Sequence, residues 1–284
     1  PVFTIPEILV TPEDTINQKL AIQEVTDKTV KNVSPGLFGQ KDILQALKFL
    51  PWIQSGSEVQ GNLLVRGGGT DQNLILMDGV PLYEVNHLLG LTSIFNEDAV
   101  NDVDIFTSGF SPKYGGRLSS IINIQIKDGN KFVHKANASV GLLGAKVHAD
   151  GPLVNERTSY NISLRTSYIN RLVAPLAKRL LDVEQSDFGY SDINLKFHHK
   201  FTENSSLSLS TYQGIDKVGF ATTTFNDEYP DIAALKADNS IDWRNNVVSL
   251  RYSHLLSEKL FLSFSASTVN YSLDSRSSNF YNTV

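Results

Sequence analysis

The chain has 284 residues, which is enough for two ordinary domains or for one domain and part of another. Its formal net charge is −5 and it has no block of Lys and Arg, so we expect no nucleic-acid partner. The absence of cysteine excludes a disulfide framework, a thiolate metal site and a cysteine nucleophile. No apolar run reaches the about 18 residues of a transmembrane helix, whereas membrane β-strands give a weaker, alternating signal that this sequence can accommodate.

The first 31 residues are predicted to form an extended leader. Pro6 and Pro12 flank a short apolar run, and a polar stretch follows as far as Lys31. The start at Pro1 shows neither the basic region nor the long apolar region of a secretory signal, so we interpret it as a mature or trimmed N-terminus.

Residues 32–132 have the pattern of a small mixed α+β domain. Apolar residues recur at helical spacing from Lys41 to Leu50, and Pro51 ends the predicted helix. Four short β-rich runs follow, each bounded by Gly, Pro, Asp or Asn; they lie at 63–65, 74–77, 103–106 and 121–126.

From residue 133 to 284 the sequence changes to polar and apolar alternation. In the clearest run, Tyr160 to Tyr168, Ile162 and Leu164 share an apolar face while Ser163 and Arg165 share a polar one. Antiparallel strands are predicted near 135–142, 144–151, 157–168, 189–200, 205–217, 241–254 and 259–272. Alternation alone is equally compatible with a soluble β-sandwich or barrel.

The connections between these strands favour a membrane barrel. Short turns at 152–157, 202–205 and 257–259 alternate with long segments at 170–189 and 214–242, as in outer-membrane barrels. Aromatic residues near strand ends fit interfacial girdles; they are Tyr168, Tyr190, Phe201, Tyr252 and Tyr271. A barrel that encloses a folded domain needs about 22 strands, so the about seven strands predicted here are only the beginning of one.

Two stretches of the α+β domain resemble the plug domain of TonB-dependent outer-membrane receptors, in the style of the Bacteroidetes receptors. The first, residues 61–83, reads GNLLVRGGGTDQNLILMDGVPLY, and the second, residues 108–124, reads SGFSPKYGGRLSSIINI. The resemblance covers roughly residues 32–129. It implies an α+β plug domain inside a large transmembrane β-barrel, in the outer membrane of a Gram-negative bacterium.

The same residues can be interpreted physically. Asp78-Gly79 between two apolar runs predicts a tight hairpin turn. The glycines after Arg66 do not indicate a phosphate site, because no Lys-Ser/Thr follows them and a strand comes next. An unpaired guanidinium in such apolar surroundings would be costly. The resemblance implies that the plug is held in the barrel by a latch, which we assign to Arg66, Asp78, Tyr114 and Arg117, although a simple solvated surface role for the arginines stays open.

The leader contains a segment that resembles the TonB box, which implies coupling to TonB in the periplasm. This segment consists of Glu7, Ile8, Leu9, Val10 and Thr11. An extended segment can add as a strand to the edge of a partner sheet, where main-chain hydrogen bonds hold it. The alternative is an ordinary first strand of the plug.

The resemblance also implies that a ligand binds the apical loops of the plug. The candidates are Gln54, Ser57, Glu58, Tyr83, Asn86 and His87. The histidines are too scattered for a metal site, no cofactor is expected, and the common catalytic motifs are absent, so we do not expect an enzyme.

The sequence thus favours energy-coupled import of a nutrient, with outer-membrane lipids around the barrel and a surface lipoprotein or larger complex as a possible further partner. Two alternatives stay open. The chain can instead belong to a structural subunit of an outer-membrane assembly that transports nothing, or to a soluble β-rich binding protein.

Overall fold

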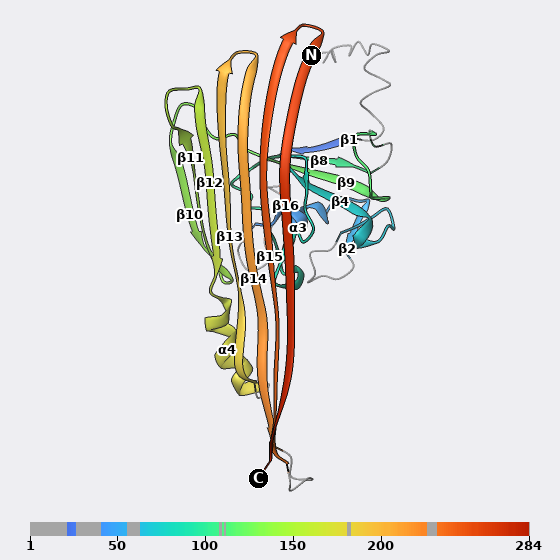
Figure 1. The fold of residues 1–284 in the computed structure, drawn as a ribbon, viewed down its shortest axis with the longest axis vertical. Coiled ribbons are helices and arrows are strands. Elements are labelled where there is room, and N and C mark those ends of the chain that lie inside the picture. Colours follow the sequence, from blue (N-terminus) through green and yellow to red (C-terminus); the bar gives the residue numbers. More distant parts are fainter. Residues whose placement is uncertain are drawn as a thin grey trace, which may run out of the picture.

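The computed structural model describes residues 22–26, 41–55, 63–107, 110, 112–180, 183–225 and 232–283. It consists of a small α+β domain packed against one face of a sheet of long strands (Figure 1). Among the described helices, none is long and apolar enough to cross a membrane. The predicted segment at residues 7–11 lies outside the described residues.

The small domain is built on a five-stranded sheet with the order β1-β8-β9-β4-β5. Strands β4 and β9 are parallel, and the other neighbours are antiparallel. The strands of this sheet are β1 (Ile22–Thr26), β4 (Asn73–Met77), β5 (Val80–Pro81), β8 (Val100–Phe106) and β9 (Ser120–Ile126). Strand β1 lies in the part of the sequence assigned above to the leader, so the domain's sheet begins before residue 32.

Shorter elements complete the domain. They are helix α3 (Ile43–Leu47), strands β2 (Ile53–Ser55), β3 (Leu63–Val65), β6 (Asn86–His87) and β7 (Thr92–Ser93), and the 3₁₀ helices η2 (Thr70–Gln72) and η3 (Leu88–Gly90). Helix α3 is shorter than the predicted stretch from Lys41 to Leu50 and has five residues. It begins after Asp42, whose side chain accepts a hydrogen bond from the Gln45 amide at 3.1 Å. The predicted hairpin turn is confirmed: Asp78 and Gly79 have φ values of 51° and 81°, and Met77 pairs with Val80.

The long sheet has seven antiparallel strands joined in sequence order. They are β10 (Lys135–Val140), β11 (Gly144–Pro152), β12 (Thr158–Ser167), β13 (Val183–Thr202), β14 (Ser205–Phe225), β15 (Ile232–Ser257) and β16 (Leu260–Thr283). All seven predicted strands are present, and the three short turns lie at one end of the sheet, which is the upper end in Figure 1.

The two long segments expected between strands are mostly regular structure. Residues Ile169–Leu180 form helix α4, which the sequence reading missed. Strand β14 continues to Phe225 and β15 begins at Ile232, so most of the expected loop at 214–242 is strand.

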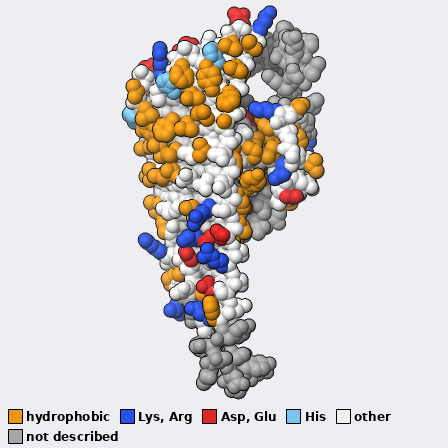
Figure 2. Space-filling view, in the orientation of Figure 1, with side chains coloured by type: hydrophobic (Ala, Val, Ile, Leu, Met, Phe, Trp, Pro, Cys, Tyr) orange, Lys and Arg blue, Asp and Glu red, His pale blue; other side chains and the backbone are white. Residues whose placement is uncertain are grey.

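The two faces of the long sheet differ in polarity. On the face away from the small domain, Leu209 lies opposite Leu250 and Tyr252 opposite Phe264. On β14 the outward positions from Leu207 to Ile215 carry no charge and are apolar except at Thr211 and Gln213. They span about 26 Å at 3.3 Å per residue, and Figure 2 shows an apolar band on this face with a charged zone beyond it. Outer-membrane barrels carry an apolar band about 25 Å tall.

Candidate functional site

The face of the long sheet toward the small domain is polar. Its charged side chains make most of the ionic contacts between the long sheet and the small domain. Alternation along each strand places these side chains inward while their neighbours form the apolar band. Lys146 on β11 pairs with Glu97 and Asp98 of the small domain, and two larger groups of residues also join the sheet to the domain. We call them the His87 cluster, which is His87, Arg165, Tyr190, Asp192 and Asp216, and the Asp78 cluster, which is Asp78, Asp128, Lys196, Ser210 and Arg251.

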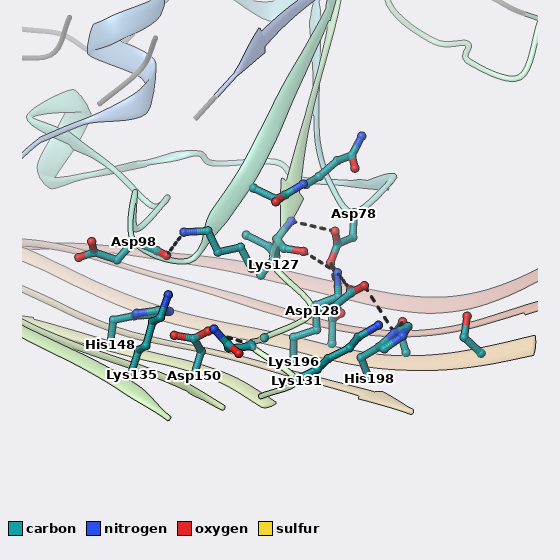
Figure 3. Close-up of a pocket in the computed structure, with 18 of the residues that line it drawn as sticks. Asp78, Asp98, Lys127, Asp128, Lys131, Lys135, His148, Asp150, Lys196 and His198 are labelled. Atoms are coloured by element: carbon teal, nitrogen blue, oxygen red, sulfur yellow. Dashed lines mark hydrogen bonds and ion pairs between the residues drawn. The ribbon is translucent and has the colours of Figure 1, made fainter. Parts of the chain in front are cut away.

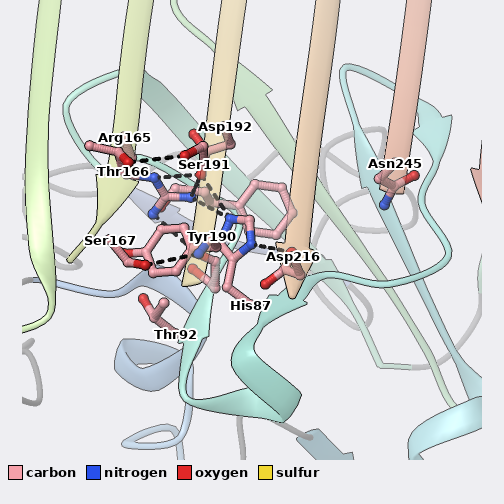
Figure 4. Close-up of polar contacts among 12 residues, drawn as sticks. His87, Thr92, Arg165, Thr166, Ser167, Tyr190, Ser191, Asp192, Asp216 and Asn245 are labelled. Carbon is pink, nitrogen blue, oxygen red and sulfur yellow. Dashed lines mark hydrogen bonds and ion pairs between the residues drawn. The ribbon is translucent and has the colours of Figure 1, made fainter. Parts of the chain in front are cut away.

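The His87 cluster is centred on an imidazole held between two carboxylates (Figure 4). His87 Nε2 lies 2.8 Å from Asp192 Oδ2, and its Nδ1 lies 2.7 Å from Asp216 Oδ2. A ring that donates from both nitrogens is an imidazolium. Burial by itself lowers the pKa of His87, but the carboxylates of Asp216 and Asp192 outweigh that effect, so the pKa is raised.

The strand residues around His87 fix the position of its ring. Arg165 Nε and Nη2 donate to Asp192 Oδ2 at 2.9 and 2.6 Å, and Arg165 Nη1 donates to the Ser93 carbonyl at 3.0 Å. The Tyr190 ring stacks on His87 with centroids 4.3 Å apart. Tyr190 therefore faces inward rather than serving in an interfacial girdle.

The turn after His87 also binds the sheet through its backbone. The Leu88 amide donates to Asp216 Oδ1 at 3.0 Å. Leu88 and Leu89 have φ values of 51° and 59°, in the left-handed region that non-glycine residues rarely adopt. The side chain of Asn245 also donates to the Glu84 carbonyl at 2.8 Å, so strands β12 to β15 all contact the segment 84–93.

The Asp78 cluster lies nearer the short turns. Asp78 Oδ2 lies 3.1 Å from Lys196 Nζ and accepts from Ser210 at 3.2 Å, and the Asp78 carbonyl accepts from Arg251. Lys196 also lies 3.0 Å from Asp128 Oδ1. Burial tends to raise the pKa of Asp128, but the nearby Lys196 ammonium prevails and the pKa is lowered.

The structure separates the four residues proposed as a latch. Asp78 contacts the long sheet, as described above. Arg66 and Arg117 are exposed, and Arg117 donates to the Gly116 carbonyl at 2.9 Å. Tyr114 packs against Phe106 within the small domain, with centroids 5.6 Å apart. Among the described residues, no carboxylate of the sheet pairs with either arginine.

The predicted apical residues also differ in exposure. Tyr83 is 67% exposed and Gln54 is also exposed. Asn86 and His87 are buried, with exposed fractions of 4% and 0%. Ser57 and Glu58 lie outside the described residues. His87 therefore contacts the sheet rather than an open apical surface, and ligand contact at the others stays a prediction.

Sequence reasoning did not single out Arg165, Asp192, Lys196 or Asp216. A signal was present, because each is an isolated charge on the polar face of an alternating strand. What the sequence could not show is the partner, since His87 and Asp216 are 129 residues apart.

Buried charged side chains attach the small folded domain to the polar face of a long antiparallel sheet, and the other face of that sheet is apolar. This arrangement is that of a plug against the wall of a barrel. Residues 19–120 match the TonB-dependent Receptor Plug Domain family. The chain thus carries a plug domain of the TonB-dependent receptor family, followed by antiparallel strands of the receptor barrel.

Solved structures show the same fold. The ferric citrate transporter FecA is 9% identical with a TM-score of 0.53, over 96% of this chain and 50% of FecA. The copper transporter OprC is 9% identical with a TM-score of 0.51, over 93% and 49%. The siderophore receptor PirA from Pseudomonas aeruginosa is 14% identical with a TM-score of 0.50, over 92% and 53%.

The chain spans about half the length of these structures. No curated protein matches it. At these identities the similarity concerns the fold, and the ligands named for those proteins are properties of those proteins.

Proposed function

We propose that the protein is an energy-coupled importer that takes a nutrient across the outer membrane of a Gram-negative bacterium. The nutrient binds at the outer surface of the plug, and residues 7–11 couple the plug to TonB. The family consists of outer-membrane receptors and transporters rather than enzymes. The observation that carries the proposal is that buried ion pairs join the plug to the inner face of the wall. A domain in that position blocks passage unless it is moved.

The position of the apolar band supports a membrane location for the wall. A charged side chain at the middle of such a band costs about 2–4 kcal/mol in a bilayer, and the outward positions from Leu207 to Ile215 are free of charge. The short turns then lie on the periplasmic side, because outer-membrane barrels have short periplasmic turns and long extracellular loops.

The experiment separates binding from coupling. The nutrient is first identified by competitive growth of cells with and without the gene on single limiting nutrients. Deletion of residues 5–11 from the full-length protein is then expected to abolish uptake of that nutrient and to leave its binding to the cell surface intact. Unchanged uptake would overturn the coupling role, and a stoichiometric protein partner with no nutrient and no TonB dependence would favour a structural subunit.

A further inference from the structure

Cavities lie against both faces of the long sheet. The cavity on the side of the plug has a volume of about 990 Å³ (Figure 3). Asp78 and Asp128 line it and pair with Lys196, so its charged groups belong to the contacts between plug and wall described above. Another cavity, a groove of about 460 Å³, lies on the outward face across strands β11 to β14. A ligand in this groove would meet the surroundings of the barrel rather than the plug.

The outward groove is built from two rows of side chains that the strand register places side by side. In the row nearer the short turns, Leu164 lies between Val147 and Ile193, and Gln213 ends the row. Val147 and Leu164 are 48% and 45% exposed although both are apolar. This row lies within the apolar band and offers its surface to a hydrocarbon chain.

The second row is more polar and lies further from the short turns. Ala145, Thr166, Ser191 and Ile215 follow one another across the four strands, and the hydroxyl groups of Thr166 and Ser191 lie 2.9 Å apart. Arg244 lies directly opposite Ile215, where this row leaves the groove. Polarity therefore rises across the groove toward the extracellular side, as it does from the acyl chain of a membrane lipid to its headgroup.

Two cationic side chains come together at this polar end. Lys217 is the next outward residue after Ile215 on β14, which makes it the diagonal neighbour of Arg244. Diagonal neighbours of an antiparallel pair lie about 7–8 Å apart, within reach of long side chains. Both side chains are exposed, and neither forms an ion pair with a described residue. The ammonium and the guanidinium can thus hold one phosphate group between them.

The nearest outward carboxylates lie one row further from the groove. Asp242 lies opposite Lys217, and Asp274 lies opposite Asp242. Arg244 is closer to the groove than either of them, because its partner Ile215 lines the groove. The charge at the mouth of the groove is therefore positive.

A polar cavity of about 810 Å³ follows beyond the two cations, between helix α4 and strands β13 to β15. Gly219, the next outward residue after Lys217, lines it. Its charged lining has both signs and suits the hydroxyl groups of a headgroup, which donate and accept hydrogen bonds; these residues are Arg171, Lys178, Asp187 and Asp238.

We propose that this outward site binds a phosphorylated membrane lipid of the leaflet on the extracellular side, with an acyl chain in the groove and the phosphate between Lys217 and Arg244. The occupant is a lipid rather than a soluble anion, because the groove continues the apolar band. Lysine and arginine form charge-assisted hydrogen bonds with a phosphate that a neutral headgroup cannot form. The membrane location of this face rests on the proposed function, whereas binding of the lipid in detergent is measured without transport.

The test is a titration of the full-length protein, purified in detergent and freed of lipid, followed by native mass spectrometry. The probes are dipalmitoyl phosphatidic acid, dipalmitoylglycerol, which has the same chains without the phosphate, and inorganic phosphate. The wild type is expected to bind the phosphatidic acid about tenfold more tightly than the diacylglycerol, and inorganic phosphate is not expected to displace it. Lys217→Gln/Arg244→Gln is expected to bind the phosphatidic acid about tenfold more weakly and to lose the preference between the two lipids.

Matched variants separate the site from the rest of the surface. Arg157→Gln/Lys259→Gln removes one arginine and one lysine from the short turns at the other end of the sheet and is expected to bind like the wild type. Ala145→Leu narrows the groove without a change in charge and is expected to weaken binding of both lipids. Ala266→Leu makes the same change on the outward face of β16, opposite Leu250, and is expected to have no effect.

Three results would overturn the proposal: no binding of the phosphatidic acid to the wild type, equal binding by the two double variants, or displacement of the lipid by inorganic phosphate. Lys217→Arg/Arg244→Lys keeps both charges and is expected to bind like the wild type, which excludes a folding defect as the cause of a loss. The protein without residues 5–11 is expected to bind the lipid normally, so a failure of coupled uptake and a failure of this site give different results.

Discussion

At the scale of single residues, His87 is the side chain most constrained by its surroundings. Its ring is fully buried, stacks on Tyr190 and lies between Asp192 and Asp216. Removing one partner of such a group leaves an uncompensated buried charge, which typically costs about 3–5 kcal/mol. The cluster therefore depends on the protonation state of one histidine.

The raised pKa of His87 predicts a pH dependence of the plug's attachment. Histidine in the unfolded chain has a pKa of about 6.5. The stabilisation that protonated His87 contributes is therefore complete below that pH, and it is lost as the pH rises through the higher pKa of His87 in the folded protein. The protection factors of the amides of residues 84–93, which correct for the base-catalysed intrinsic exchange rate, should fall on the alkaline side of this range. His87→Gln should exchange faster throughout and lose that pH dependence, whereas His134→Gln, at an exposed histidine, should behave like the wild type.

Asp78 is the corresponding residue of the second cluster. Asp78→Asn leaves Lys196 with one fewer carboxylate in a buried site, and we expect a loss of about 3 kcal/mol in the free energy of unfolding. Lys196→Gln in the same protein should recover part of this loss, with a coupling energy of about 1–3 kcal/mol in denaturant unfolding. If the losses in unfolding free energy of the two single variants simply added in the double variant, Asp78 and Lys196 would not act as a unit. The control is Asp71→Asn, at an exposed position, which should leave the free energy of unfolding unchanged.

At the scale of elements, alternation located the strands but not their lengths. Period-two patterning is clear where one face meets the plug and the other carries the apolar band, as in Tyr160 to Tyr168. Beyond the band the outward face also carries charged residues, such as Lys217 opposite Asp242, so the alternation weakens while the backbone pairing continues to Phe225 and from Ile232. Helix α4 was missed because Pro175 within it indicates a break.

The junction between plug and wall depends on a glycine. Gly129 has φ of 92°, and a Cβ atom there would lie 2.2 Å from the Tyr160 carbonyl oxygen. Gly129→Ala should therefore destabilise the protein by more than about 1 kcal/mol, the usual cost of a strained backbone conformation. Gly115→Ala, where nothing lies within 4 Å, should leave the unfolding midpoint nearly unchanged. Equal midpoints for the two variants would contradict this role.

The apolar band gives a prediction about insertion. Leu209 points outward within the band, so Leu209→Lys should cost up to about 2–4 kcal/mol in lipid and reduce folding into vesicles. Ser240→Lys, on the same face but paired with Gly219 beyond the end of the band, should have little effect. If both lysines were tolerated equally, this face would not lie in a membrane.

At the scale of the whole molecule, local motifs identified the plug, but its contacts with the wall required the fold. The glycine-rich stretch after Arg66 and the Asp78-Gly79 turn are short-range patterns that a sequence shows directly. The partners of His87 come from strands more than a hundred residues away, and no local pattern specifies them. For the same reason the role of Asp78 could be anticipated only from the family resemblance, not from its neighbours.

The central claim is that residues 7–11 transmit work from TonB to this plug. The chain has no cysteine, so within it a single introduced thiol reports one position, and any cysteine elsewhere in the full-length protein is first replaced by serine. In cells that carry TonB with one cysteine in its periplasmic domain, Ile8→Cys in the full-length protein is predicted to give a disulfide-linked complex with TonB, and Asn17→Cys is predicted to give little. No complex from Ile8→Cys, or equal yields from the two positions, would contradict the account.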